Sequence, residues 1–145
     1  MLPRRDDSLD SLLPSFREAV VKLVGQMSAA GYPAIVWETG RSLARAQALN
    51  KTGRGITLSM HSYGAAADIL CKRHHWDCAE HGCDFYEVLA DKAEALGLTS
   101  GHRWKKVDSV HVQALPVGHQ AQFRKLKPEQ RDAFVRPFIR MPRSK

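Results

Sequence analysis

The chain has 145 residues, 43% hydrophobic and 26% charged, proportions typical of a folded globular domain and not of a disordered segment. Its net charge of +7 at pH 7 indicates attraction to a polyanion, such as nucleic acid, an anionic membrane or the acidic polymers of a bacterial wall. No apolar run approaches the roughly 18 residues of a membrane-spanning helix, and the N-terminal residues lack the apolar core of a secretory signal. We therefore expect one domain over residues 1–145, with no membrane insertion.

The first part of the chain carries helix and strand signals in alternation. Residues 9–30 place apolar side chains at helical spacing and predict an amphipathic helix. Residues 33–38 are short, β-branched and aromatic, so they predict a strand. Ser42 is suited to cap a helix that runs to residue 50, and residues 51–58 then predict a basic, glycine-containing loop.

The next two elements surround an irregular segment. Residues 65–70 predict a buried strand, because small and β-branched residues surround a single polar side chain, Asp68. Residues 84–96 predict a helix, and Asp84 with Glu87 predicts a capping box at its start.

Residues 109–113 alternate in a way that predicts a further strand. In that strand His111 and Gln113 share one face, and Val110 and Val112 share the other. The valines would anchor the strand in the core, so the two polar side chains would face a cleft.

The aspartate in the buried strand predicts a metal site. A buried carboxylate is costly unless positive charge meets it, and a metal ion is among its commonest partners. A catalytic zinc needs about three nitrogen or oxygen ligands and an open position for water. His61 and Asp68 supply two ligands, and His111 is the best placed third. Asp108, three residues before His111, is a candidate general base.

Two segments of the chain match a known pattern. They read Ser59-x-His61-x-x-Gly64-x-Ala66-x-Asp68 and, further along, Trp104-x-x-x-Asp108-x-x-His111. This pattern resembles the zinc D-alanyl-D-alanine carboxypeptidase family, especially its L-alanyl-D-glutamate endopeptidase branch of phage endolysins. Residues 39–42 with Gln47 also resemble the stretch that precedes the first zinc motif in this family. The resemblance covers roughly residues 37–113.

The resemblance implies a zinc peptidase that cleaves the stem peptide of peptidoglycan. It implies that His61, Asp68 and His111 bind one catalytic zinc ion and that Asp108 is the base that activates the attacking water. It further implies that Arg41 holds a substrate carboxylate or the developing oxyanion. Substrate-binding or supporting positions are Ser59, Gln47, Trp104 and Gln113.

The resemblance also implies a fold and a setting. The fold would be α+β, with a small, mostly antiparallel sheet flanked by helices, as in hedgehog-type and DD-peptidase domains. Two short helices, the second from Pro128, and a frayed basic tail over residues 140–145 would complete the domain. The partner would be bacterial peptidoglycan and the protein a monomer. It would accumulate in the host cytoplasm and reach the wall during lysis, as a bacteriolytic enzyme.

Residues 71–83 form an insertion that the family pattern does not explain. Its three cysteines, an odd number, argue against a disulfide framework and for reduced thiols or metal ligands. A second, structural zinc site is one interpretation, with donors Cys71, Cys78, His81 and Cys83. The irregular spacing leaves a second interpretation open, a loop with free thiols and exposed histidines that include His74 and His75.

Three other functions stay open. The protein could be a D-alanyl-D-alanine carboxypeptidase of the same family. It could be a non-catalytic basic zinc module that binds nucleic acid or another polyanion, or an inactive domain of the same fold that only recognises a ligand. The pair of Asp108 and His111 argues against both non-catalytic functions, and the basic residues are scattered along the chain. We therefore expect no specific nucleic acid partner.

Overall fold

The structure, a computed structural model, describes residues 2–51 and 59–141. The helices in this part of the chain are α1 (Pro14–Ala29), α2 (Leu43–Lys51), α3 (Phe85–Ala95), α4 (Gln120–Arg124) and α5 (Pro128–Val135), with short 3-10 turns between them. The strands are β1 (Ala34–Glu38), β2 (Ala66–Cys71), β3 (Thr99–Ser100) and β4 (His111–Gln113). The predicted basic loop was expected to begin at Lys51, but Lys51 is the last residue of α2; the rest of that loop, 52–58, and most of the predicted tail lie outside the described residues.

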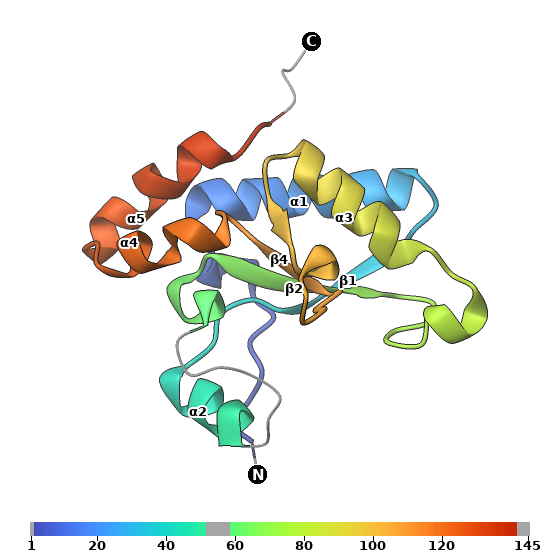
Figure 1. Cartoon of the computed structure of the whole chain (residues 1–145), viewed down its shortest axis with the longest axis horizontal. Helices are drawn as coiled ribbons and strands as arrows, with labels where there is room; N and C mark the ends of the chain where they lie inside the picture. The colour runs from blue at the N-terminus through green and yellow to red at the C-terminus, as the bar shows by residue number, and fades with distance from the viewer. Residues whose placement is uncertain (1, 52–58, 142–145) are drawn as a thin grey trace.

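The four strands form one sheet in the order β1-β2-β4-β3, and every neighbouring pair is antiparallel (Figure 1). The predicted α+β fold with a small antiparallel sheet is therefore confirmed. The longest strand, β2, lies between β1 and β4, and five of its six residues are buried. This explains its run of small and branched side chains, because both faces of a central strand meet other parts of the protein.

The register of the sheet brings three polar residues level with one another. Asp68 in β2 pairs with Glu38 in β1 on one side and with His111 in β4 on the other. An irregularity between Val36 and Glu38 shifts the β1 register just before this point. Because paired residues of an antiparallel sheet project to the same face, Asp68 and His111 point into one space.

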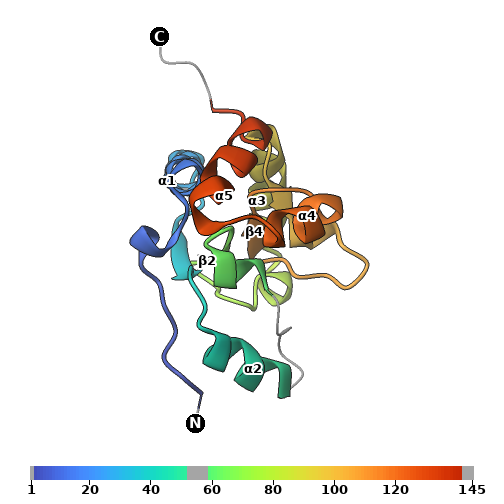
Figure 2. The ribbon, with the colours of Figure 1, turned by 90° about the vertical axis from the view of Figure 1, so that its left-hand side faces the viewer.

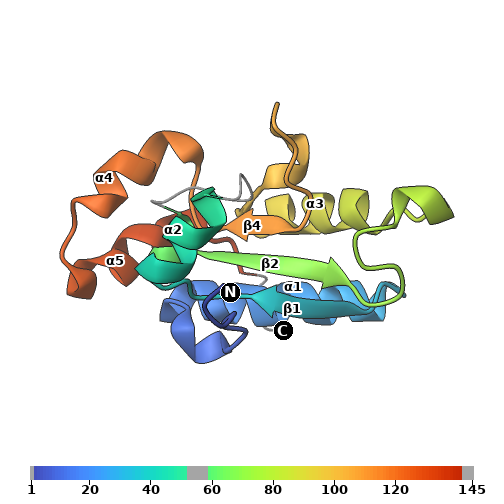
Figure 3. The same cartoon turned by 90° about the horizontal axis from the view of Figure 1, so that it is seen from below.

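The helices cover the sheet unequally. In Figures 1 and 2, α1, α3 and α5 lie on one side of the sheet, whereas α2 lies on the other. Seen from below, α2 stands in front of the end of the sheet where β2 begins (Figure 3). The hydrophobic core includes fully buried Phe16, Phe85, Ile69 and Val112. None of the helices in the described ranges is long and apolar enough to cross a bilayer.

Helix α1 begins later than its sequence pattern predicts. The predicted start was Leu9, but residues Leu9–Ser11 form a separate 3-10 turn and α1 starts at Pro14. The reason is Pro14 itself, because a proline fits the first helical position and forces the residue before it out of the helical region. Leu13 accordingly has ψ 141°, an extended value.

The predicted capping box at the start of α3 is wrong. Asp84 is the residue before the helix, but its side chain makes no capping hydrogen bond. Its Oδ1 instead accepts a hydrogen bond of 2.8 Å from the hydroxyl group of Tyr32. A contact to a residue far away in the sequence has replaced the local one.

Asp132 caps α1 from another helix. Its carboxylate accepts hydrogen bonds from the backbone N–H of Ser15 (2.8 Å) and from the hydroxyl of Ser15 (3.0 Å), and Arg136 donates a further one at 2.9 Å. Burial by itself would raise the pKa of Asp132, but these donors outweigh it and lower that pKa. The carboxylate therefore fastens α5 to the start of α1.

We predict that Asp132→Asn lowers the free energy of unfolding by about 1 kcal/mol near neutral pH, the usual worth of a helix cap. Because the folded-state pKa is depressed, this contribution is present above the ordinary aspartate range and is lost as the pH falls through the folded pKa. Urea unfolding of both proteins at several pH values measures the difference. Glu129→Gln, at an exposed position in α5, is the control. A pH-independent difference would contradict the assignment.

Candidate active site

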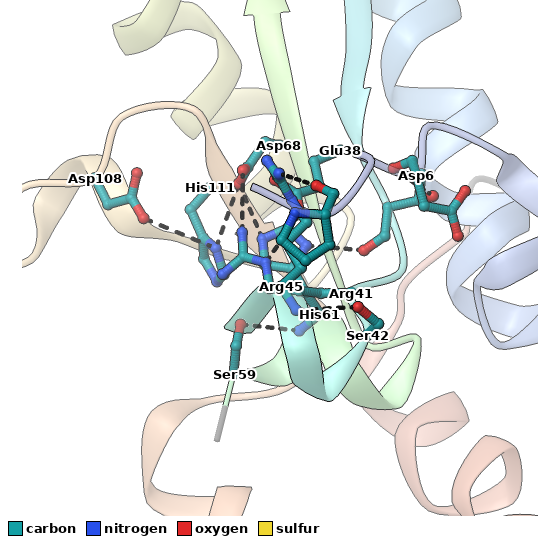
Figure 4. A network of polar contacts seen from close by, with 12 residues as sticks. Asp6, Glu38, Arg41, Ser42, Arg45, Ser59, His61, Asp68, Asp108 and His111 are labelled. Carbon is teal, nitrogen blue, oxygen red and sulfur yellow. Dashed lines mark hydrogen bonds and ion pairs between the residues drawn. The ribbon is translucent and has the colours of Figure 1, made fainter. Parts of the chain in front are cut away.

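Three potential metal ligands converge on the exposed side of the sheet. Nε2 of His61 lies 3.1 Å and Nδ1 of His111 lies 3.6 Å from the same Oδ1 atom of Asp68 (Figure 4). One donor atom from each residue falls within 4.8 Å of the other two. The structure thus brings together the three residues that the sequence proposed as zinc ligands.

Hydrogen bonds fix the orientation of both imidazole rings. Nδ1 of His61 lies 2.8 Å from the backbone carbonyl oxygen of Thr39, which can only accept, so Nδ1 carries the proton and Nε2 is left as a lone-pair donor. Nε2 of His111 likewise donates to Oε1 of Gln113 at 2.8 Å, which leaves Nδ1 of His111 facing Asp68. Such outer hydrogen bonds are typical of histidines that bind metal, so the donor set fits a divalent cation.

The charge balance of the three residues also fits a cation. Burial would raise the pKa of Asp68, but the imidazoles of His61 and His111 outweigh it and hold that pKa well below its usual range. Burial would likewise lower the pKa of His111, yet the Asp68 carboxylate raises it. The Asp68 carboxylate is therefore a nearly buried anion that stabilises a positive charge placed between the two imidazoles.

The first sequence motif owes its spacing to a tight turn. Ser59 precedes the 3-10 helix Met60–Tyr63, and its hydroxyl accepts a hydrogen bond from the N–H of His61 at 3.2 Å. Gly64 then ends the turn with φ 69°, a left-handed conformation that favours glycine. A Cβ atom there would also lie 2.7 Å from the carbonyl oxygen of Ser11. Ser59 thus supports the backbone of His61.

A buried ion-pair group stands beside the three ligands. Glu38 is buried, and its Oε2 accepts hydrogen bonds from Nε of Arg41 at 2.9 Å and from Nε of Arg45 at 2.8 Å. Burial raises the pKa of Glu38, but the two guanidinium groups outweigh it and lower that pKa. Nη2 of Arg41 reaches to 3.9 Å from Oδ2 of Asp68, so the guanidinium borders the centre.

Sequence reasoning missed Glu38, Arg45 and the carbonyl of Thr39. An acid at the end of a strand, three residues before Arg41 and seven before Arg45, is a usable signal for the ion pairs. No side-chain pattern could reveal the Thr39 carbonyl, because every residue has one.

Asp108 lies at the edge of the same centre. Its Oδ2 is 3.9 Å from Nδ1 of His111, and its side chain is 50% exposed. Partial burial raises the pKa of Asp108 above the usual range of an aspartate. Its backbone is held on both sides, because its N–H donates to Gly101 at 2.8 Å and its carbonyl accepts from the N–H of His111 at 3.2 Å. The ring of Trp104 packs against His111 with centroids 5.1 Å apart.

Gly101 is predicted to keep Asp108 in position. A Cβ atom at residue 101 would lie 2.5 Å from the carbonyl oxygen of Asp108, so Gly101→Ala must displace the segment that carries this carboxylate. We expect catalytic activity to fall about 10- to 100-fold, as misplacement of a reacting group by about 1 Å can cause. Zinc content should stay unchanged. Gly118→Ala is the matched control, because no atom lies within 4 Å of its added Cβ. Equal activity of the two variants would contradict this role.

An open cleft of about 1000 Å³ contains the centre. The three potential ligands and the candidate base, Asp108, line this cleft. Four of the positions proposed to bind or support the substrate also line it: Arg41, Ser59, Trp104 and Gln113. Lys105 and Lys106 add positive charge at its edge. Gln47 is exposed on α2 and is not among the described residues that line the cleft, so the structure does not bring it to the site.

Gln113 is predicted to tune metal affinity through His111. It is buried, accepts from Nε2 of His111, and donates to the carbonyl of Leu115 and to Gln120, each at 2.8 Å. Gln113→Leu removes the acceptor that orients the imidazole, so we expect zinc affinity to fall about 10- to 100-fold. Competition with a chromogenic chelator measures this. The exposed Gln122→Leu should change nothing, and an unaltered affinity in Gln113→Leu would contradict the prediction.

The fold and this site define a hydrolase of the metallopeptidase class. Residues 52–114, which span both motifs, match the family model for D-alanyl-D-alanine carboxypeptidase. The match covers less than half of the chain, but this part contains His61, Asp68, Asp108 and His111. No curated protein matches the chain significantly.

Solved structures share the fold. The L-Ala D-Glu endopeptidase ChiX of Serratia marcescens aligns with a TM-score of 0.56 and 23% identity, over 78% of this chain and 87% of ChiX. DacB of Streptococcus pneumoniae D39 aligns with a TM-score of 0.54 and 19% identity, over 85% of this chain and 79% of DacB. The LD-carboxypeptidase LdcB gives a TM-score of 0.53 and 20% identity, over 88% and 80%. At these identities the likeness establishes the fold.

Proposed function

We propose that this protein is a zinc-dependent endopeptidase that hydrolyses the L-Ala–D-Glu bond of peptidoglycan stem peptides. The observation that carries the proposal is the convergence of His61, Asp68 and His111 on one point, with the Asp108 carboxylate beside it in an open cleft. The likeness to ChiX, described as an L-Ala D-Glu endopeptidase, supports the choice of bond.

One zinc ion would be held by Nε2 of His61, Nδ1 of His111 and the Asp68 carboxylate. Bound there, zinc supplies a Lewis acid that polarises the scissile carbonyl and lowers the pKa of water. The protein keeps the donors ready, because the Thr39 carbonyl and Gln113 hold each imidazole in the tautomer that the ion requires.

Asp108 would act as the general base and then as the general acid. Its carboxylate accepts a proton from the attacking water while the water oxygen forms a bond to the carbonyl carbon of the substrate. When the C–N bond breaks, Asp108 returns this proton to the departing amine. A raised pKa suits both roles, because it makes the carboxylate a stronger base and its protonated form easy to reach.

Positive charge around the cleft fits a substrate that carries carboxylates. Arg41 borders the centre, and its guanidinium would grip a substrate carboxylate or the developing oxyanion. Glu38 limits the freedom of this side chain by accepting from its Nε, so the guanidinium is positioned in advance. Lys105 and Lys106 extend the positive charge along the wall of the cleft.

The biological setting belongs to the same proposal. We infer a phage endolysin that acts as a single domain and a monomer, accumulates in the host cytoplasm and reaches the wall during lysis. A net charge of +7 favours contact with the anionic wall, and this contact should weaken as salt is added.

Digestion of purified peptidoglycan tests the function. The protein is incubated with the polymer, with and without a chelator and with zinc added back, and the released fragments are identified by mass spectrometry. We expect new N-terminal D-Glu ends that disappear with the chelator and return with zinc. Cleavage that continues at full rate without metal would overturn the proposal.

The same digest separates the alternatives. Release of free D-Ala would replace the endopeptidase by a carboxypeptidase, the activity in the family's description. No cleavage by a zinc-loaded protein would favour a ligand-binding module, for which binding to nucleic acid or wall polymer is then measured.

A further inference from the structure

A second group of potential metal ligands lies at the opposite end of β2. Cys71 is the last residue of the strand, and Cys78 and Cys83 lie in the loop that leads to α3. The three sulfur atoms fall within 4.8 Å of one another, and no disulfide joins them. Cys71 and Cys78 are buried, and Cys83 is half-buried.

The spacing of the sulfurs is close to that of a zinc site. A tetrahedral ion with Zn–S distances of about 2.3 Å holds its sulfur ligands about 3.8 Å apart. The three thiols therefore need only small inward shifts to share one ion. The three sulfurs come together from the end of a strand and from two positions in the following loop.

The loop backbone gathers these sulfurs through an unusual conformation. The N–H of His74 donates to Sγ of Cys71 at 3.4 Å, and the N–H of Cys83 donates to the carbonyl of Cys78 at 2.9 Å. His75 has φ 51°, a left-handed value that is uncommon outside glycine. Tyr86 fixes this point, because its hydroxyl donates to the carbonyl of His75 at 2.7 Å and accepts from the N–H of Cys71 at 3.1 Å.

Cys71 and Cys78 lie in different electrostatic surroundings. Burial would raise the pKa of Cys71, but the N–H groups of His74 and Arg73, together with the other two thiols, lower it. Burial and its two sulfur neighbours raise the pKa of Cys78. Zinc binds cysteine as the thiolate, so an ion at this point would release the thiol protons.

We propose that Cys71, Cys78 and Cys83 bind a structural zinc ion, separate from the active site. His81, which the sequence offered as a fourth ligand, does not join this group among the described residues: its ring stacks on that of His74 with centroids 4.3 Å apart, and only the three thiols lie within 4.8 Å of one another. A cavity of about 590 Å³ lined by Cys78 and Cys83 gives the ion a path from solvent. The proposal rests on these thiols and does not depend on the proposed function.

The ion would fasten one wall of the catalytic cleft. The loop carries Trp76, which lines the cleft and packs edge-on against Trp37 with ring centroids 5.0 Å apart. The Trp76 side chain is 57% exposed, so the backbone of this loop determines much of its position. A metal between Cys71 and Cys83 shortens the free length of this loop, so Trp76 keeps its position at the rim.

Zinc content tests the proposal. We expect two zinc equivalents per chain in the wild type, one in Cys78→Ser and one in His61→Ala, measured by mass spectrometry of metals after dialysis. Glu80→Ala, an exposed position in the same loop, is the matched control and should keep both. One equivalent in the wild type that Cys78→Ser retains would overturn the second site. Loss of this one equivalent in Cys78→Ser would instead support it and count against the active-site zinc.

A second measurement covers the case in which Cys78→Ser does not fold. The wild type and His61→Ala are loaded with cobalt(II), and their near-ultraviolet spectra are recorded. Thiolate ligands give an intense sulfur-to-cobalt charge-transfer band, which His61 and His111 cannot produce. We expect this band in both proteins, with an intensity that corresponds to one cobalt ion bound by the three thiols of each chain. Its absence from both would overturn the proposal.

Discussion

Replacement of Asp108 by alanine is expected to abolish peptidoglycan cleavage and to leave both zinc content and folding unchanged. The expected loss in turnover is about 10²- to 10⁴-fold, the usual contribution of a positioned acid–base group. Metal should remain, because Asp108 stands 3.9 Å from His111 and is not one of the three converging ligands. Folding should remain, because the Asp108 side chain is 50% exposed. Turnover on purified peptidoglycan and zinc content are measured on the same preparation.

Two further variants sharpen this experiment. Asp108→Asn keeps the shape of the side chain and removes its basicity, so it should be nearly as inactive as the alanine variant. Asp10→Ala is the control for loss of a carboxylate, because Asp10 is 92% exposed and lies outside the cleft wall in the described part of the chain. Turnover within a few-fold of wild type in Asp108→Asn would remove Asp108 as the base.

Replacement of His61 by alanine is expected to remove the active-site zinc together with all detectable cleavage. The loss of zinc affinity should exceed the 10- to 100-fold typical of an outer-shell substitution, because a direct ligand is lost. The variant also leaves the Thr39 carbonyl without its imidazole partner, so a modest loss of stability should accompany it. Zinc titration and thermal unfolding measure the two effects.

His119→Ala is the control for loss of an imidazole. His119 is exposed, and its ring packs against Phe138, away from the ligands. This variant should keep full zinc content and full turnover. If His61→Ala binds zinc as tightly as His119→Ala does and still cleaves peptidoglycan, His61 is not a ligand.

The two metal sites make opposite predictions for the same pair of variants. Loss of His61 should stop cleavage and spare the thiol cluster, whereas loss of Cys78 should spare the catalytic ligands and alter only the wall that carries Trp76. A failure of the proposed function therefore shows in peptidoglycan digestion, and a failure of the second site shows in zinc stoichiometry.

Sequence alone determined the features that depend on residues close together along the chain. The alternation at 109–113 correctly placed His111 and Gln113 on one face, because side chains of a strand alternate with a period of two. The buried strand with its single aspartate follows from the same local geometry. These patterns were sufficient to nominate His61, Asp68 and His111.

Only the tertiary structure decided how these elements meet. The sheet order places β2 between β1 and β4, so Glu38 and His111 flank Asp68 from distant parts of the chain. For the same reason Tyr32 displaced the predicted local cap at Asp84.

The thiol cluster shows the same limit. The spacing of Cys71, Cys78 and Cys83 is irregular, and only a folded loop with a left-handed His75 brings their sulfurs together. Local periodicity reports which face a side chain occupies. The residues that it contacts on that face come from distant parts of the chain, and a local sequence pattern carries no information on which distant segments meet.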